Sequence, residues 1–187
     1  TRFFMLHRSH DSTVDFDLEM TGGTGGRVGM TLAYTPKPPV SPIVPGIGSA
    51  LGFAGTNQQG FGVAFVTSRS SKLDPGSNFV GIAAGIRPRS SPTSMLYPYS
   101  ADPGVSLRER TVHVKSTITN GEELTIDVDG KRLIEIPVAM HVKAWLGNAP
   151  EIYGGPAYSG SFLQFTASTG PANYQQHLVK NLKVTYD

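Results

Sequence analysis

Three acidic residues near the start of the 187-residue chain alternate with apolar ones, in the segment Asp15-Phe16-Asp17-Leu18-Glu19. Successive side chains of an extended strand point to opposite faces, so these carboxylates are expected to share one face. Carboxyl groups four residues apart on one face could act as the nucleophile and the general acid of a hydrolytic reaction. The same pattern is typical of an ordinary strand with one solvated face, and both interpretations stay open at this point.

Histidine, cysteine and serine add little to this chemistry. His7 and His10 form an H-x-x-H pair, but neither a third ligand nor a helical context accompanies it, so it is a weak candidate for a metal site. The chain has no Cys, which excludes disulfides, thiolate ligands and a cysteine nucleophile. No serine lies in a G-x-S-x-G turn, and nucleophilic hydrolysis therefore has little support.

The composition points to many strands joined by tight turns. Glycine (22 residues) and proline (14 residues) are frequent, whereas charged residues make up only 16% of the chain, which argues against a coiled coil or a charged disordered segment. The formal net charge of +2 is too small for a nucleic-acid footprint. No apolar run approaches the roughly 18 residues that cross a bilayer. We therefore predict no nucleic-acid partner and no membrane insertion.

Period-two alternation recurs along the chain, and helical periodicity does not. The clearest signal is a β-meander with turns at Asn120-Gly121 and Asp129-Gly130. We interpret residues 36–45 as a surface loop and residues 87–106 as a loop or an irregular edge. Strands are expected at residues 14–20, 29–34, 62–67, 78–84, 111–118, 124–128, 132–138, 160–167 and 178–186. An all-β antiparallel sandwich or barrel of about ten strands is the predicted fold class.

Three groups of segments occur in the order and near the spacing found in the L-type lectins, which include legume seed lectins and cargo receptors of the early secretory pathway. Residues 26–34 (GRVGMTLAY) resemble the family's G-A-D-G-L-A-F strand. Residues 49–55 (SALGFAG), 62–67 (GVAFVT), 74–75 (DP) and 78–82 (NFVGI) resemble its run L-G-Y-x-G, V-A-V-E-F-D-T, D-P and N-H-V-G-I. Residues 162–170 (FLQFTASTG) and 177–179 (HLV) resemble V-G-F-S-A-S-T-G and H-x-V.

This resemblance implies a concanavalin A-like antiparallel β-sandwich, or jelly roll, that spans residues 1–187 as one domain. Because the sequence does not begin with Met, we expect the domain to be excised from a longer protein. The resemblance also implies carbohydrate binding at one edge and a location outside the cell, at the cell surface or in the lumen of the secretory pathway. His177 follows the last turn, where the family also has His, and is expected to make structural hydrogen bonds.

The family's metal ligands are largely replaced in this chain. A Glu, a strand Asp, a loop Asn, a loop Asp and a His hold a transition metal and a calcium ion in the family. These positions fall on Ala64, Val66, Ser70, Asp74 and Phe79, so that only Asp74 retains the ligand type. Because a hard cation takes about six to eight oxygens, we predict that no metal or cofactor is bound and that packing has replaced coordination.

The sugar-binding position is altered too, since the family's sugar-contacting Asp falls on Val28. Asn173 and Tyr174 together offer an amide for sugar hydroxyls and an aromatic face for the C–H side of a ring, although a plain solvent-exposed turn is the alternative. The candidate ligand-binding residues are Arg27, Arg69, Ser70, Asp74, Asn173 and Tyr174.

Three functions are left open by the sequence. The first is a non-catalytic, metal-independent recognition module for a glycan or glycoprotein. The second is a structural or protein-interaction module of a surface or secreted protein that has lost sugar binding. The third is a glycoside hydrolase, because residues 15–19 resemble the E-x-D-x-E strand of glycosidases built on the same sandwich, with Asp15 one methylene shorter than the expected Glu. We predict the first function and no catalytic residue.

Overall fold

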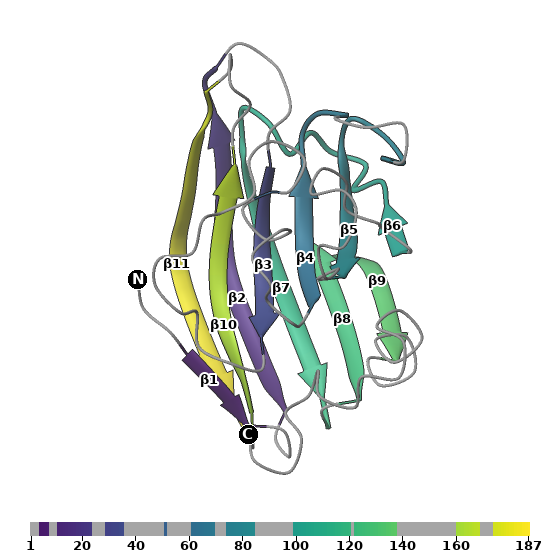
Figure 1. Ribbon diagram of the computed structural model, residues 1–187, viewed down its shortest axis with the longest axis vertical. Coiled ribbons are helices and arrows are strands. Elements are labelled where there is room, and N and C mark those ends of the chain that lie inside the picture. Colours follow the sequence, from purple (N-terminus) through teal and green to yellow (C-terminus); the bar gives the residue numbers. More distant parts are fainter. Residues whose placement is uncertain are drawn as a thin grey trace, which may run out of the picture.

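Alternating apolar and polar residues organise the described part of the chain into eleven antiparallel strands (Figure 1). The computed structural model describes residues 4–7, 11–23, 29–35, 51, 61–69, 74–84, 99–120, 122–137, 160–168 and 174–187. The strands are β1 (Phe4–His7), β2 (Ser12–Thr21), β3 (Gly29–Thr35), β4 (Phe61–Val66), β5 (Phe79–Ala84), β6 (Tyr99–Ala101), β7 (Thr111–Thr119), β8 (Glu123–Val128), β9 (Lys131–Pro137), β10 (Gly160–Ser168) and β11 (Gln176–Tyr186).

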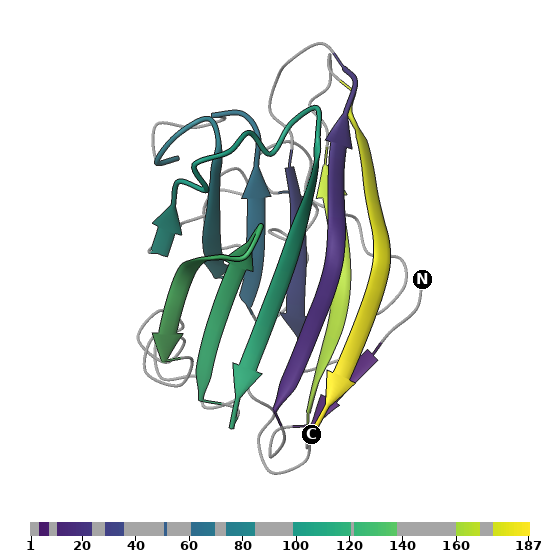
Figure 2. The same cartoon turned by 180° about the vertical axis from the view of Figure 1, so that it is seen from behind.

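The strands form two sheets that pack face to face. One sheet has six strands in the order β1-β10-β3-β4-β5-β6, and the other has five in the order β11-β2-β7-β8-β9. Figure 2 shows the five-stranded sheet from the opposite side to Figure 1, with β11 and β9 at its two edges. This arrangement confirms the predicted all-β antiparallel sandwich.

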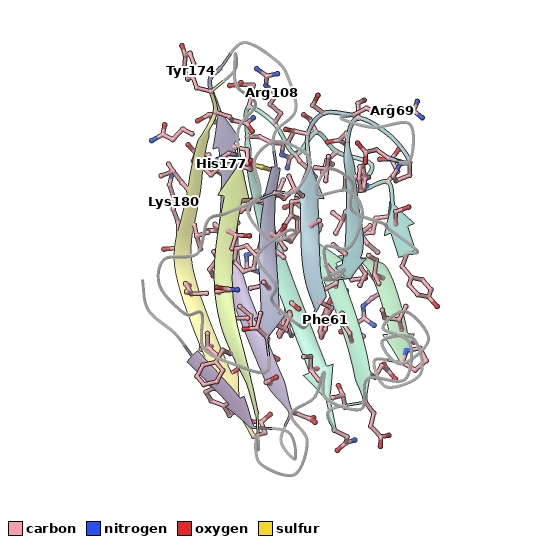
Figure 3. The ribbon with its side chains drawn as sticks, viewed as in Figure 1. Phe61, Arg69, Arg108, Tyr174, His177 and Lys180 are labelled. Atoms are coloured by element: carbon pink, nitrogen blue, oxygen red, sulfur yellow. The ribbon has the colours of Figure 1, made fainter. Side chains whose placement is uncertain are left out.

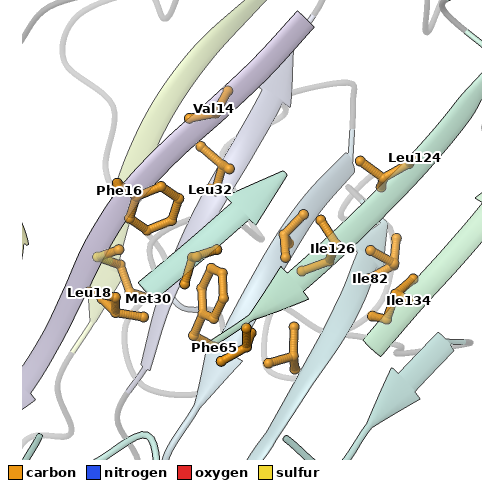
Figure 4. Close-up of a cluster of buried hydrophobic side chains, with 14 of the residues drawn as sticks. Val14, Phe16, Leu18, Met30, Leu32, Phe65, Ile82, Leu124, Ile126 and Ile134 are labelled. Atoms are coloured by element: carbon orange, nitrogen blue, oxygen red, sulfur yellow. The ribbon is translucent and has the colours of Figure 1, made fainter. Parts of the chain in front are cut away.

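The hydrophobic core fills the space between the sheets (Figure 4). Strand β2 shows most clearly how the sequence pattern builds this core. Its alternate residues Val14, Phe16, Leu18 and Met20 are buried, while the residues between them are half-buried. Phe16 packs edge-to-face on Phe65 of the other sheet, with ring centroids 6.1 Å apart. Period-two alternation therefore decides which side chains of β2 enter the core.

The nine strands predicted from the sequence are all present, with boundaries that differ by at most two residues. Asp129 and Gly130 both have positive φ (49° and 79°), as a two-residue hairpin turn requires. The short strands β1 and β6 were not predicted, because four and three residues at sheet edges carry too little alternation. The predicted loop at residues 36–45 lies outside the described residues, and none of the described residues forms a helix long and apolar enough to cross a membrane.

Candidate functional site

At one end of the sandwich, four segments that are distant in sequence come together around the ends of β2 and β4 and the starts of β7 and β11. They are residues 22–23, 67–69, 108–109 and 174–175, and we call this region the loop end. Figure 3 shows Tyr174, Arg108 and Arg69 at this end. Hydrogen bonds and close backbone packing join the segments.

The turn after β2 is held by the segment that precedes β7. The Nη2 group of Arg108 donates to the carbonyl oxygens of Gly23 at 3.0 Å and of Gly22 at 3.4 Å. The backbone N–H of Gly22 donates to Oε2 of Glu109 at 3.4 Å, and the N–H of Glu109 donates to the carbonyl of Met20 at 2.9 Å. Both glycines have positive φ, which explains why glycine occupies this turn.

This turn packs against the backbone that leads into β11. A Cβ atom on Gly23 would overlap the carbonyl oxygen of Tyr174, so only glycine fits here. The next residue, Gln175, is buried and accepts a hydrogen bond from the Thr67 hydroxyl at 3.5 Å, which links it to the end of β4. The side chain of Tyr174 itself is 71% exposed. An aromatic ring thus projects into solvent from a backbone that is fixed on two sides.

Three of the five positions at which the resemblance places metal ligands are apolar and buried. Ala64, Val66 and Phe79 are at most 3% exposed, and Val66 lies directly opposite Phe79 in the β4–β5 register. They form one cluster on the outer face of the six-stranded sheet, whose members are Ala33, Leu51, Ala64, Val66, Phe79 and Ala83. Hydrocarbon side chains offer no oxygen or nitrogen to a cation, so this donor set does not fit the family's metals.

Asp74, the one position that retains the family's metal-ligand type, is also withdrawn from solvent. Asp74 is 3% exposed, so it does not present its carboxylate to a ligand outside the protein. Among the described residues, no group of three or more His, Cys, Asp or Glu side chains is placed to hold a metal ion.

The structure brings two of the six predicted ligand-binding residues to the exposed surface of the loop end. Arg69 and Tyr174 are both exposed there. The predicted ligand residues that lie outside the described part of the chain are Arg27, Ser70 and Asn173.

His177, which was expected to make structural hydrogen bonds, has one ring nitrogen without a partner among the described residues. It lies on β11 opposite Met20, and the nitrogen without a described partner is the buried Nε2 atom. Burial in these surroundings lowers the pKa of the imidazole, because the charged form loses its hydration.

The carboxylates of β2 point away from the core, on the outer face of the five-stranded sheet. Glu19 accepts hydrogen bonds from Nζ of Lys180 at 2.6 Å and from the Thr111 hydroxyl at 3.0 Å. The hydrogen bond from Lys180 lowers the pKa of Glu19, and the hydrogen bond from His113 does the same for Asp17. A general acid needs a raised pKa, so this environment does not suit Glu19 for that role.

Arg108 and Gly23 were missed as site residues. Arg108 lies outside the alternating segments, and the two glycines that it binds lie more than 80 residues away in the sequence. The glycine pair 22–23 directly after a strand indicated a turn, but it did not indicate what packs on that turn. The glycine pair was therefore the one feature of the sequence that could have indicated this part of the site.

No protein-family profile matches the sequence, and no curated protein matches it significantly. Solved structures do match the fold. The potassium-bound carbohydrate recognition domain of Emp46p matches with a TM-score of 0.63 at 12% identity, over 93% of this chain and 70% of that one. The Ca²⁺/Man-bound exoplasmic/lumenal domain of VIP36 matches with a TM-score of 0.64 at 14% identity, over 97% and 70% of the two chains. This chain therefore has the L-type lectin-like β-sandwich fold.

Proposed function

We propose that this domain is a non-catalytic recognition module that binds a glycan at its loop end without a metal ion. The observation that carries the proposal is Tyr174, an aromatic side chain that is 71% exposed on a fixed backbone. The face of an aromatic ring is electron-rich and suits the polarised C–H groups on one side of a sugar ring. Arg69 is exposed at the same end, but Figure 3 places it on the β5 side, away from Tyr174, so the proposal rests on Tyr174.

The structural neighbours support carbohydrate as the ligand class. The Emp46p domain is a carbohydrate recognition domain, and the VIP36 domain is known in a Ca²⁺/Man-bound form. The VIP36 domain is exoplasmic or lumenal, which supports a location for this protein in the secretory lumen, at the cell surface or outside the cell.

Metal independence is supported by the apolar cluster at the lectin metal positions. A cation there would have to displace the packed side chains of Val66 and Phe79, which are buried against each other. We infer that this packing holds the region in place of coordination bonds.

Absence of catalysis is supported by the ion pair of Glu19 with Lys180. The lowered pKa keeps Glu19 ionised at neutral pH, so it has no proton to donate to a leaving group.

A glycan-array screen with and without a strong chelator tests the proposal. We expect binding that the chelator leaves unchanged, and we expect Tyr174→Ala to weaken it about tenfold, which corresponds to roughly 1.4 kcal/mol. Tyr186→Ala is the matched control, because Tyr186 is also exposed but lies at the other end of β11. Loss of binding in chelator would refute metal independence, and full binding by Tyr174→Ala would place the site elsewhere.

A second candidate, a protein-interaction module, is favoured by one specific feature of β11. The exposed large hydrophobic side chains of the described residues are Tyr174, Leu182 and Tyr186, and all lie on or beside this strand. Strand β11 is an edge of the five-stranded sheet, where an extended segment of another protein can add a strand. Absence of glycan binding with and without chelator would favour this candidate.

A further inference from the structure

The segment between β6 and β7 is anchored at several points before it reaches the loop end. The side chain of Asn78 donates to the carbonyl of Val105 and accepts from the N–H of Leu107, both at 2.9 Å. Leu107 is fully buried in the core. The Ser106 hydroxyl accepts from the N–H of Arg108 at 3.1 Å and donates to its carbonyl at 2.9 Å. These bonds fix the backbone from which Arg108 extends.

Arg108 and Glu109 then hold the glycine turn from two sides. Arg108 donates to both glycine carbonyls, while Glu109 accepts from the N–H of Gly22 and pairs with Nε of Arg108 at 3.2 Å. Glu109 has a φ of 58°, a left-handed conformation that is strained for a residue other than glycine. Such strain persists where the surrounding contacts demand it, and here it accompanies the contacts to the turn.

The turn formed by Gly22 and Gly23 limits where the backbone of Tyr174 can lie. Gly23 meets the carbonyl of Tyr174 with no room for a Cβ atom. A displacement of Gly23 therefore either opens this contact or moves Tyr174 with it. Arg108 is therefore linked to the backbone of Tyr174 through one intermediate residue, Gly23.

We propose that Arg108 is a positioning residue for ligand binding, which acts through Gly23 to hold Tyr174 in place. This inference rests on the proposed glycan-binding function, since Tyr174 is the group that would stack on the sugar ring. The guanidinium group of Arg108 would thus hold the ligand-binding residue Tyr174 in place. In this domain, apolar side chains occupy Ala64, Val66 and Phe79, where the lectin resemblance expects metal ligands.

The first arm of the test examines the protein without ligand. Arg108→Gln and Gly23→Ala are expected to shift the NMR amide resonances of Tyr174 and Gln175. Arg110→Gln is the control for Arg108, because Arg110 pairs with Asp129 at 2.7 Å instead. Gly130→Ala is the control for Gly23, because it has the same sign of φ but a Cβ atom there would meet no atom within 4 Å. Unchanged resonances in Arg108→Gln, or equal shifts in Arg110→Gln, would overturn the positioning role.

The second arm measures binding to a mannose-terminated oligosaccharide and to the best glycan of the array. Arg108→Gln is expected to weaken affinity about tenfold while the Tm changes by no more than about 4 °C. Equal affinity of Arg108→Gln and the wild type would overturn the proposal. If the wild type binds no glycan, the proposed function fails, and the first arm still decides whether Arg108 positions Tyr174.

Discussion

At the scale of single residues, two histidines of this domain have opposite electrostatic environments. His113 lies on the outer face of β7, where Nδ1 is 3.0 Å from Oδ1 of Asp17 and Nε2 is 3.5 Å from Oδ1 of Asp15. The hydrogen bond to Asp17 raises the pKa of His113 above its usual value. His177 is half-buried and has no carboxylate partner among the described residues, and desolvation lowers its pKa. The same residue type therefore responds to acid in opposite ways.

These shifts predict opposite pH dependence for two variants. The stabilisation by protonated His113 is present below its unfolded pKa and is lost as pH rises through the higher folded pKa. His113→Gln should therefore cost about 0.2–1 kcal/mol near pH 5.5 and less near pH 8.5. For His177, stability falls as pH drops below the unfolded pKa, because the unfolded chain takes up the proton first.

His177→Leu should accordingly make stability less sensitive to acid than in the wild type. Urea unfolding of both variants and the wild type at about pH 5.5 and about pH 8.5 measures this. A pH dependence identical to that of the wild type in either variant would contradict the assigned environment of that histidine.

At the scale of secondary structure elements, the β8–β9 hairpin shows how two turn residues set the register of a sheet edge. Asp129 and Gly130 connect Val128 to Lys131, which are paired across the hairpin. Asp129 also accepts hydrogen bonds from Arg110 at 2.7 Å and from the N–H of His113 at 2.8 Å. The turn is therefore joined to β7 as well as to its own strands.

Gly130→Ala should destabilise the domain by about 1–2 kcal/mol, because alanine at a φ of 79° is strained although no atom lies within 4 Å of its Cβ. Gly76→Ala is the matched control, since its Cβ would meet only a backbone nitrogen 3.9 Å away and its φ is not left-handed. The control should be neutral or slightly stabilising, because alanine restricts the unfolded chain. Equal urea unfolding midpoints for Gly130→Ala and Gly76→Ala would show that the positive φ of Gly130 does not contribute to stability.

At the scale of the whole molecule, one buried polar pair connects the two sheets. The hydroxyl of Tyr34 on β3 lies 2.7 Å from Oγ of Ser116 on β7, and both residues are at most 2% exposed. Burial raises the pKa of Tyr34 well above its usual value, so the phenol stays neutral. The Tyr34 ring also stacks on Phe61, with centroids 4.8 Å apart. The pair therefore aligns the sheets through a hydrogen bond within an apolar core.

A double-mutant cycle tests this alignment. Tyr34→Phe and Ser116→Ala should each cost about 1–3 kcal/mol, because each leaves a buried hydroxyl without a partner. The double variant should cost less than the sum of the two, since it removes both hydroxyls. Additive losses in the free energy of unfolding, measured in urea, would show that the two groups do not interact.

Much of the fold follows from local sequence patterns. Alternation along residues 14–20 and 111–118 indicated which side chains enter the core, because the period of a strand is a local property of the backbone. The Asp129-Gly130 turn was predictable for the same reason, since positive φ is favoured by those two residue types. The short edge strands β1 and β6 were not, because pairing with a neighbour rather than their own residues makes them strands.

The sequence by itself determined nine of the eleven strands and the sandwich, and it places Ala64, Val66 and Phe79 at three positions where the lectin resemblance expects metal ligands. Only the tertiary structure decided that Asp17 faces His113 of β7 and that Glu19 faces Lys180 of β11, which lowers the pKa of both carboxyl groups. It also decided that Arg108 meets the glycine turn and that Gly23 meets Tyr174. The physical reason is that such contacts depend on which strands are neighbours and how their connecting segments pack, and no short-range pattern encodes either.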